Sequence, residues 1–252
     1  MHYVLSFSAP FSAGYEEHTP TMTEPDPSLP RCSLDLEPVR AVLDRLHAEA
    51  GAQRTGFVKI AVLWGLDALL RRKPSIEDEA RRFKDLYIPL SAETGRFAYL
   101  VARSLGASRI VEFGTSFGVS TIYLAAAVKD GGGGLVIGSE IEPGKVMQAR
   151  ANLEEAGLGQ YAEIREGDAQ ETLRDAGGPV DMALLDGWKD LYLPILEILA
   201  PQLRPGAVVL GDNIKTFPKA LAPYVARVRD ADRGFQSVTL PLGAGTEYSV
   251  RL

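Results

Sequence analysis

The chain has 252 residues with 46% hydrophobic and 24% charged side chains, the composition of an ordinary globular protein long enough for one large domain. Its net charge of -6 argues against a nucleic-acid-binding protein, because such proteins usually present a basic surface. No apolar run approaches the roughly 20 residues that a membrane-spanning helix needs, and the single cysteine, Cys32, cannot form an internal disulfide. These observations predict a cytoplasmic protein without a membrane or nucleic-acid partner.

The amino-terminal third divides into two parts. Residues 1–31 are rich in Pro, Ser, Thr and Glu and lack periodicity, which predicts a disordered arm. Residues 32–90 contain stretches with helical patterns: Asp35–Ala50, Phe57–Leu70 and Pro74–Tyr87. We expect these helices to form a cover over the substrate side or a dimer surface. Simple packing against the rest of the fold is an equal alternative.

From residue 91 onward the pattern alternates between helix and strand. The predicted helices are Ser91–Leu105, Gly118–Val128, Lys145–Ala156, Ala169–Asp175, Leu191–Ala200 and Pro218–Val228. The predicted strands are Arg109–Phe113, Leu135–Ser139, Ala162–Arg165, Asp181–Leu185, Ala207–Leu210, Phe235–Leu240 and Glu247–Leu252. This alternation is typical of an α/β fold with a doubly wound, mostly parallel seven-stranded sheet. The short Gly-rich turn before the last strand makes that strand antiparallel.

Acidic residues follow two strands that are joined by one helix. Asp186 comes after the strand that ends at Leu185, and Asp212 and Asn213 come after the strand that ends at Leu210. A strand–helix–strand crossover is parallel, so both groups leave the sheet at its carboxyl edge, where ligands bind in open α/β sheets. Two carboxylates and an amide oxygen form a hard-oxygen set of the kind that Mg²⁺ accepts.

A lysine, Lys189, stands three residues after the first of these carboxylates, and the combination predicts metal-assisted chemistry. Each residue also has a structural interpretation. Asp and Asn are favoured helix N-caps, and Lys189 could form a surface ion pair with Asp190 or Glu197. Capping explains one such residue comfortably but not the trio combined with a lysine, which favours the metal.

A second set of polar residues follows the first three strands. Gly114–Gly118 comes after Glu112 and has the spacing G-x-x-x-G, which differs from the G-x-G-x-x-G of a dinucleotide cradle. Glu140 ends the second strand, where a carboxylate can accept both hydroxyls of a ribose, although Glu142 is an alternative and either could be a solvated loop residue. Gly167–Gln170 follows the third strand, where polar groups can meet an adenine edge. The set predicts an adenosine compound without a long phosphate chain, since no P-loop motif is present.

These motifs resemble the class I S-adenosylmethionine-dependent methyltransferases and, more narrowly, the metal-dependent catechol and caffeoyl-CoA type O-methyltransferases. The resemblance covers about Ser91 to Ile214 and reaches the carboxyl terminus more loosely. Its most specific segment is Leu185–Pro194, with Asp212 and Asn213 at the expected distance. It implies a Rossmann-like methyltransferase fold in which residues 91–252 form the S-adenosylmethionine-binding catalytic domain.

The resemblance also implies a role for individual residues. The implied metal ligands are Asp186, Asp212 and Asn213, and the implied catalytic residues are the general base Lys189 and Asp186. The implied cofactor contacts are Glu112, Gly114, Thr115, Ser116, Gly118, Ser120, Glu140, Ile141, Asp168, Ala169, Gln170, Asp186 and Trp188. Gly187 departs from the pattern, because the catechol enzymes often have a bulkier residue there. Beyond Asn213 no carboxylate that would hold a second catechol hydroxyl is identified.

The expected function is Mg²⁺-dependent, or other divalent-cation-dependent, transfer of the S-adenosylmethionine methyl group to a hydroxyl of a small catechol-like or other vicinal-oxygen substrate, such as a secondary metabolite. One alternative is a metal-independent methyltransferase with a different acceptor. Another is a cofactor-binding protein without transfer chemistry. A nicotinamide dehydrogenase is disfavoured by the glycine spacing. A homodimer through the apolar faces of the amino-terminal helices is a further hypothesis.

Overall fold

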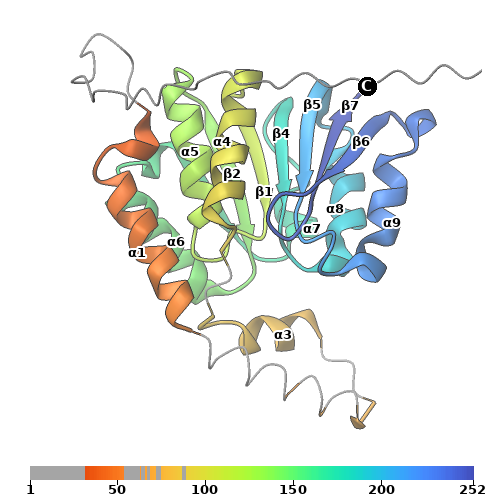
Figure 1. Ribbon diagram of the computed structural model, residues 1–252, viewed down its shortest axis with the longest axis horizontal. Helices are drawn as coiled ribbons and strands as arrows, with labels where there is room; N and C mark the ends of the chain where they lie inside the picture. The colour runs from red at the N-terminus through yellow and green to blue at the C-terminus, as the bar shows by residue number, and fades with distance from the viewer. Residues whose placement is uncertain (1–31, 54–62, 64–65, 67–68, 72–74, 87–88) are drawn as a thin grey trace, which may run out of the picture. The chain divides into compact units, whose positions relative to one another are not determined.

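The computed structural model describes residues 32–252 except residues 54–62, 64–65, 67–68, 72–74 and 87–88 (Figure 1). The predicted arm over residues 1–31 lies outside the described residues, and so does most of the predicted helix Phe57–Leu70. Within the described part of the chain, no helix is both long and apolar enough to cross a membrane.

The described residues contain a seven-stranded sheet with the order β3-β2-β1-β4-β5-β7-β6. Its strands are β1 (Arg109–Phe113), β2 (Leu135–Glu140), β3 (Ala162–Glu166), β4 (Val180–Leu185), β5 (Leu203–Gly211), β6 (Phe235–Leu240) and β7 (Thr246–Arg251). The first five strands pair in parallel, and β7 is antiparallel to both of its neighbours. The prediction of a mostly parallel sheet with an antiparallel last strand is therefore confirmed.

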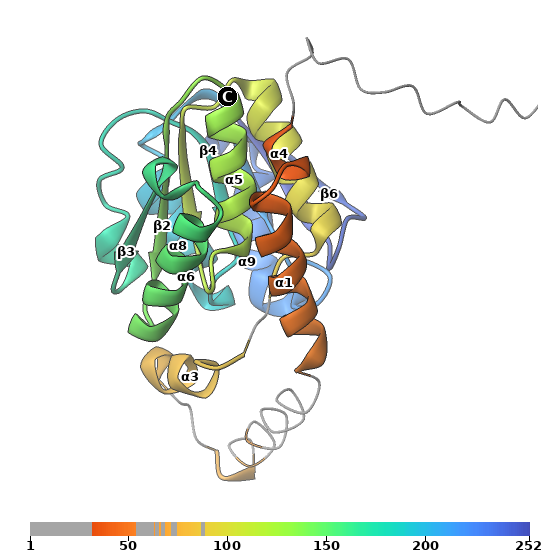
Figure 2. The same ribbon diagram turned by 90° about the vertical axis from the view of Figure 1, so that its left-hand side faces the viewer.

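Helices cover both faces of this sheet (Figure 1, Figure 2). The helices are α1 (Val39–Ala52), α3 (Ile76–Arg82), α4 (Ala92–Leu105), α5 (Val119–Asp130), α6 (Pro143–Glu155), α7 (Ala169–Thr172), α8 (Tyr192–Leu199) and α9 (Pro218–Val228). In β1, Ile110 packs in a cluster with residues of α1, α4, α5 and α6, and Val111 packs in a second cluster with residues of α7, α8 and α9. Neighbouring strand residues point to opposite faces, so two cores sandwich the sheet.

Helix α1 belongs to the first of these cores. Its apolar residues Val39, Val42 and Leu46 are buried together with residues of α5 and α6. Just before α1, the backbone nitrogen of Ser33 donates to Oδ2 of Asp130 at the end of α5 (2.9 Å). The apolar face of α1 is thus covered within its own chain, which removes this helix from the argument for a homodimer.

Some element boundaries differ from the predicted ones for local reasons. Helix α7 was expected to reach Asp175 but ends at Thr172. Nη1 of Arg165 donates to the carbonyls of Thr172 (2.8 Å) and Asp175 (2.6 Å), so these carbonyls are engaged by a side chain instead of a further helical turn. Helix α3 ends at Arg82 instead of Tyr87, and the next residue, Phe83, packs against Trp188.

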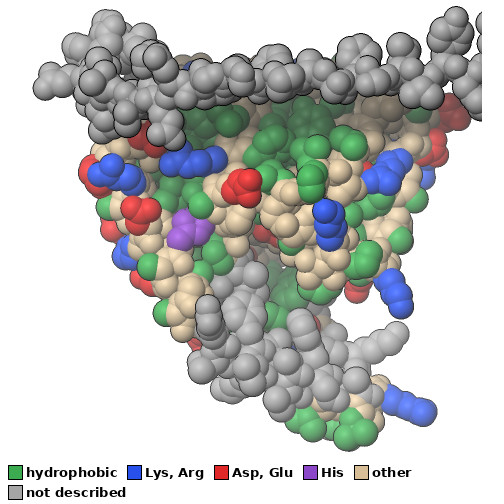
Figure 3. Space-filling model, in the orientation of Figure 1, with side chains coloured by type: hydrophobic (Ala, Val, Ile, Leu, Met, Phe, Trp, Pro, Cys, Tyr) green, Lys and Arg blue, Asp and Glu red, His purple; other side chains and the backbone are tan. Residues whose placement is uncertain are grey.

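The described surface carries charges of both signs. Figure 3 shows Asp and Glu side chains interspersed with Lys and Arg side chains on one face of the molecule. Some are paired at short range, such as Arg45 and Glu155, whose Nη2 and Oε2 atoms lie 2.6 Å apart. Exposed pairs of this kind contribute at most about 1 kcal/mol, so the two cores hold the fold together.

Candidate functional site

The candidate site lies at the carboxyl edge of the sheet, where the loops after β1, β4 and β5 meet. The backbone nitrogen of Asp186 donates to the carbonyl of Phe113 (2.9 Å), and that of Asp212 donates to the carbonyl of Leu185 (3.0 Å). These bonds extend the strand pairing to the first residue of each loop. Asp186 and Asp212 therefore converge at one edge, as the crossover pattern predicts.

Two glycines allow the β1 and β4 loops to touch. A Cβ on Gly114 would lie 2.6 Å from Cα of Gly187, and a Cβ on Gly187 would lie 2.4 Å from the ring of Phe113. Gly114 also has a φ of +97°, a conformation that side chains with a Cβ rarely adopt. The absence of a bulkier residue at Gly187 follows from the position of the Phe113 ring.

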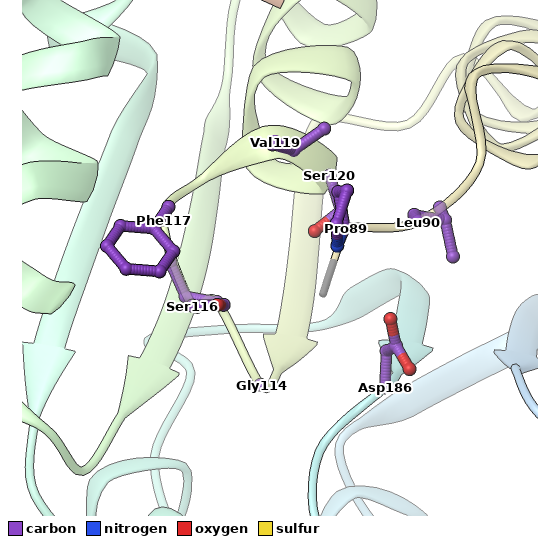
Figure 4. Close-up of a pocket in the computed structure, with 9 residues that line it drawn as sticks. Pro89, Leu90, Gly114, Ser116, Phe117, Val119, Ser120 and Asp186 are labelled. Atoms are coloured by element: carbon purple, nitrogen blue, oxygen red, sulfur yellow. The ribbon is translucent and has the colours of Figure 1, made fainter. Parts of the chain in front are cut away.

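A pocket opens beside these loops (Figure 4). Its lining residues are Pro89, Leu90, Gly114, Thr115, Ser116, Phe117, Val119, Ser120 and Asp186. The predicted cofactor contacts among them are Gly114, Thr115, Ser116, Ser120 and Asp186. The residues that the sequence analysis missed are Pro89, Leu90, Phe117 and Val119. Phe117 and Val119 are the neighbours of Gly118 in the glycine motif, so the sequence pattern could have identified them. Pro89 and Leu90 come from a segment without a polar motif, so the pattern gave no signal for them.

Eight predicted cofactor contacts are not part of this lining, among them Gly118, Trp188 and Ile141. Gly118 caps α5 with a φ of +86°, and a Cβ there would lie 3.2 Å from Cβ of Ala149. The ring of Trp188 packs edge-on against Phe83, with 5.6 Å between the ring centroids. Ile141 is half-buried directly after β2. Contact of these three residues with a cofactor stays a prediction.

Glu112 is fully buried beneath the β1–α5 loop. Its Oε2 accepts hydrogen bonds from Oγ1 of Thr115 (3.0 Å) and Oγ1 of Thr121 (2.5 Å), which tie the loop and helix α5 to β1. Its Oε1 is buried without a hydrogen-bond partner among the described residues. Burial raises the pKa of Glu112, and the neighbouring hydroxyls, Ser120 first, oppose that rise. An unsatisfied carboxylate oxygen at this position fits a ligand that donates a hydrogen bond.

The two acids at the end of β2 have different environments. Glu142 is the N-cap of α6, and its Oε2 accepts from the backbone nitrogen of Lys145 (2.8 Å). Glu140 accepts from the backbone nitrogen of the pocket residue Ser116 at Oε2 (2.8 Å) and from that of Glu142 at Oε1 (2.9 Å). A carboxylate oxygen has two lone pairs, so Glu140 retains acceptor capacity next to the pocket while Glu142 serves the helix. This difference favours Glu140 as the ribose contact.

The polar residues after β3 form a helix cap. Oδ1 of Asp168 accepts from the backbone nitrogen of Gln170 (2.8 Å), and Ala169 is buried. Asp168 itself is exposed and lies outside the pocket lining. Asp168 is therefore the N-cap of α7, and contact of Asp168, Ala169 and Gln170 with an adenine stays a prediction.

One amide links the two carboxylates of the predicted metal set. Nδ2 of Asn213 donates to Oδ1 of Asp186 (2.9 Å) and to Oδ2 of Asp212 (2.8 Å), while Oγ1 of Thr246 donates to Oδ1 of Asp212 (3.3 Å). Burial raises the pKa of Asp186 to about 7; the ammonium of Lys189 lowers it and the Asp212 carboxylate raises it. Burial also raises the pKa of Asp212. Burial thus outweighs the attraction of the Lys189 ammonium for both carboxylates.

This donor set fits a divalent cation. Among the described residues no group of three or more His, Cys, Asp or Glu side chains could hold a metal, so a cation held here by three side chains would need the Asn213 amide as its third ligand. Rotation of that amide by half a turn places its oxygen where its nitrogen now meets both carboxylates, and amide oxygen is a usual ligand of Mg²⁺ and Ca²⁺. A cation there would offset the burial of two carboxylates.

Lys189 faces this cluster and not the outer surface. Its Nζ lies 3.4 Å from Oδ1 of Asp186 and 3.1 Å from Oη of Tyr192, and the side chain is 18% exposed. The alternative partner Glu197 instead pairs with Arg227, whose Nε lies 2.7 Å from Oε1 of Glu197. In the described structure, Lys189 therefore does not form the alternative surface ion pair with Glu197.

Comparison with known proteins identifies related chains. A family model described as "Methyltransferase domain" matches residues 111–214, which include the β1 loop and the acidic cluster. The chain is 31% identical over 163 residues to a catechol O-methyltransferase of Niastella koreensis, a match that covers 63% of this chain and 72% of that protein. It is 37% identical over 128 residues to a catechol O-methyltransferase of Mycobacterium tuberculosis, covering 50% of this chain but only 57% of that protein.

A solved structure shares the arrangement of the elements. The crystal structure of the O-methyltransferase TomG from Streptomyces achromogenes, in complex with S-adenosylmethionine, superposes with a TM-score of 0.58. The two chains are 29% identical, and the superposition covers 76% of this chain and 96% of TomG. The Rossmann-like fold is thus shared with a protein that binds the adenosine compound predicted for the pocket.

Proposed function

Because the chain belongs to the class I S-adenosylmethionine-dependent O-methyltransferases of catechol and caffeoyl-CoA type, we propose that it transfers the methyl group of S-adenosylmethionine to a hydroxyl of a small catechol-like or other vicinal-oxygen substrate. A divalent cation takes part in this proposal. The observation that carries it is the cluster of a lysine and three hard-oxygen side chains beside the pocket: Lys189, Asp186, Asp212 and Asn213.

S-adenosylmethionine occupies the pocket in this proposal. Glu140 accepts the ribose hydroxyls, since Ser116 and Glu142 already orient its two oxygens. Oε1 of Glu112 accepts from the amino group of the methionine part, which supplies the partner that this buried atom lacks in the chain. The Gly114 turn brings the backbone close to the cofactor.

The acidic cluster holds the cation through Asp186, Asp212 and the amide oxygen of Asn213. Such a cation would lower the pKa of the acceptor hydroxyl and help to orient its oxygen toward the methyl group. Oγ1 of Thr246 keeps the Asp212 carboxylate in place by its bond to Oδ1. The exposed ring of Phe217 lies below the Lys189 ammonium, 5.8 Å from Nζ to the ring centroid, and offers an apolar surface to an aromatic acceptor.

The neutral amine of Lys189 takes the proton of the acceptor hydroxyl at Nζ and becomes an ammonium. Methyl transfer from a sulfonium is an in-line displacement in which the O–CH₃ bond forms as the S–CH₃ bond breaks, so the attacking oxygen has to lose its proton. A general base must lie within hydrogen-bond reach of that proton. Nζ lies next to Asp186, the residue shared by the pocket lining and the acidic cluster, which is the position this role requires.

The experiment is methyl transfer to a panel of catechols, measured with Mg²⁺ and with EDTA, after calorimetric titration of S-adenosylmethionine. We expect Mg²⁺-dependent transfer that disappears in Asp186→Ala and Lys189→Met. The matched control is Asp190→Ala, which removes an exposed carboxylate of the same loop. Transfer that persists in EDTA would support the metal-independent methyltransferase, and cofactor binding without transfer to any acceptor would support a binding protein. No cofactor binding would overturn the proposal.

Location in the cytoplasm and formation of a homodimer accompany this proposal as hypotheses. The single Cys32 supports a reducing compartment. Sedimentation of the purified chain measures its oligomeric state, and a monomer at all concentrations would remove the homodimer.

A further inference from the structure

Two buried tyrosines stack beside the acidic cluster but differ in their hydroxyl contacts. Tyr192 begins α8 and Tyr224 lies in α9; both are almost completely buried, and their rings meet edge-to-face with 5.5 Å between the centroids. Oη of Tyr224 has no hydrogen-bond partner among the described residues. Oη of Tyr192, in contrast, lies 3.1 Å from Nζ of Lys189 and 3.1 Å from the backbone carbonyl oxygen of Asp212.

The chemistry of these groups fixes the direction of both bonds. An ammonium only donates and a carbonyl only accepts, so the Tyr192 oxygen accepts from Lys189 and its hydrogen points to the carbonyl of Asp212. That carbonyl belongs to a residue whose nitrogen is bonded to Leu185 in the neighbouring strand. The hydroxyl thus connects a long, flexible lysine side chain to the backbone of the sheet.

The tyrosine ring is itself held in place. It packs edge-on against Phe113 from β1, with 6.2 Å between the centroids, and against Tyr224 from α9. Apart from Tyr192, the described residues give Nζ of Lys189 one further hydrogen bond, the 3.4 Å contact to Asp186, which is long for a charge-assisted bond. The well-formed bond of Lys189 is therefore the one that its Nζ donates to the rigid Tyr192 hydroxyl.

We propose that Tyr192 is a positioning residue whose hydroxyl holds Lys189 beside Asp186, so that Nζ stands ready to receive the proton of the acceptor. This inference rests on the proposed function of Lys189. In the neutral amine that acts as the base, one hydrogen is bound by Tyr192 and the other by Asp186, which leaves the lone pair directed at the acceptor. Without the hydroxyl, the four-carbon side chain regains rotamers that take Nζ away from the site.

The test compares Tyr192→Phe with Tyr224→Phe as its matched control. Each variant removes one hydroxyl from the stacked pair and keeps the ring, but only Tyr192→Phe releases Lys189. With catechol as the acceptor and saturating S-adenosylmethionine and Mg²⁺, we expect Tyr192→Phe to lower kcat about tenfold or more, the size of one hydrogen bond to a charged group. The KM values for cofactor and catechol should change by less than about twofold, and Tyr224→Phe should keep the kcat of the parent protein.

A further variant separates the lysine from the cation site, because Tyr192 also bonds the backbone of Asp212. Thr246→Val removes the hydroxyl that donates to Oδ1 of Asp212 and leaves Tyr192 and Lys189 unchanged. We expect it to raise the Mg²⁺ concentration needed for half-maximal activity without lowering kcat at saturation. If Tyr192→Phe shows that same behaviour, its hydroxyl serves the cation site and the proposal is overturned.

A readout without an acceptor completes the test. Acetylation of Lys189 by an N-hydroxysuccinimide ester, followed by peptide mass spectrometry, should be several-fold faster in Tyr192→Phe than in Tyr224→Phe, because a released side chain reaches solvent more often. Equal labelling and equal kcat in the two tyrosine variants would overturn the inference. If Lys189→Met retains transfer, the base in the proposed function is wrong, whereas an inactive Lys189→Met beside a fully active Tyr192→Phe removes only the role of Tyr192.

Discussion

Replacing Gly187 with alanine probes the packing between the two loops that build the site. The new Cβ would lie 2.4 Å from Cζ and 2.6 Å from Cε1 and Cε2 of Phe113. That ring is 4% exposed and packs against Tyr192, so it has no open space to move into. The φ of Gly187 is outside the left-handed region, so the cost comes from the steric overlap alone.

Overpacking of this kind costs about 1–3 kcal/mol, and a protein of this size loses about 2–4 °C of melting temperature per kcal/mol. Urea denaturation of Gly187→Ala and the parent protein measures the difference in the free energy of unfolding. Gly51→Ala is the control, because a Cβ at Gly51 meets nothing within 4 Å and alanine favours the helix by up to about 1 kcal/mol. If Gly187→Ala is as stable as the parent protein, the close contact between Gly187 and Phe113 is wrong.

Three further predictions concern charges and the acidic cluster. In EDTA, the free energy of unfolding should fall as the pH rises from about 4 toward 7. Burial raises the pKa of Asp186 to about 7, so this carboxyl ionises less readily in the folded protein than in the unfolded chain. Denaturation at several pH values measures the slope, which Asp186→Asn should reduce. Arg229→Ala leaves the buried carboxylate of Glu247 without its ion-pair partner and should cost about 3–5 kcal/mol of stability in urea denaturation. The control is Arg174→Ala, which removes an exposed ion pair with Glu171 and should change stability by less than about 1 kcal/mol. Glycine tolerates the φ of +68° at position 213, so Asn213→Gly should abolish Mg²⁺ binding in calorimetry without backbone strain. In EDTA it should cost about 1–3 kcal/mol of stability, because Asp186 and Asp212 lose the amide that donates to both.

The sheet was predictable because buried parallel strands appear in the sequence as short apolar runs between turn residues. The bounds of β1 and β6 agree with the predicted ranges. Strand β5 begins at Leu203, four residues earlier than expected, because Pro205 and Gly206 interrupt the apolar run. The pairing of β5 with β4 shifts register next to this interruption, and a single-sequence pattern does not reveal such a shift.

The site was predictable where chain topology alone brings residues together. Strand ends placed Asp186, Asp212 and Asn213 at one edge, since crossover connections leave no other arrangement. The role of Tyr192 was not predicted, because the carbonyl that its hydroxyl meets lies 20 residues away along the chain. A signal did exist: Tyr192 stands three residues after Lys189, a spacing that puts two side chains on the same side of a helical turn.

Binding of the cofactor and positioning of the base depend on the same few contacts. The β1 loop that lines the pocket contacts the β4 loop at Gly114 and Gly187. Phe113, at the end of β1, packs both on Gly187 and on the ring of Tyr192, whose hydroxyl accepts from Lys189. A displacement of Phe113 would therefore disturb the pocket and the lysine together. This is why Gly187→Ala should lower methyl transfer by more than its loss of stability alone explains, while Gly51→Ala should leave transfer unchanged. A Gly187→Ala variant that keeps full activity would show that the two halves of the site are independent.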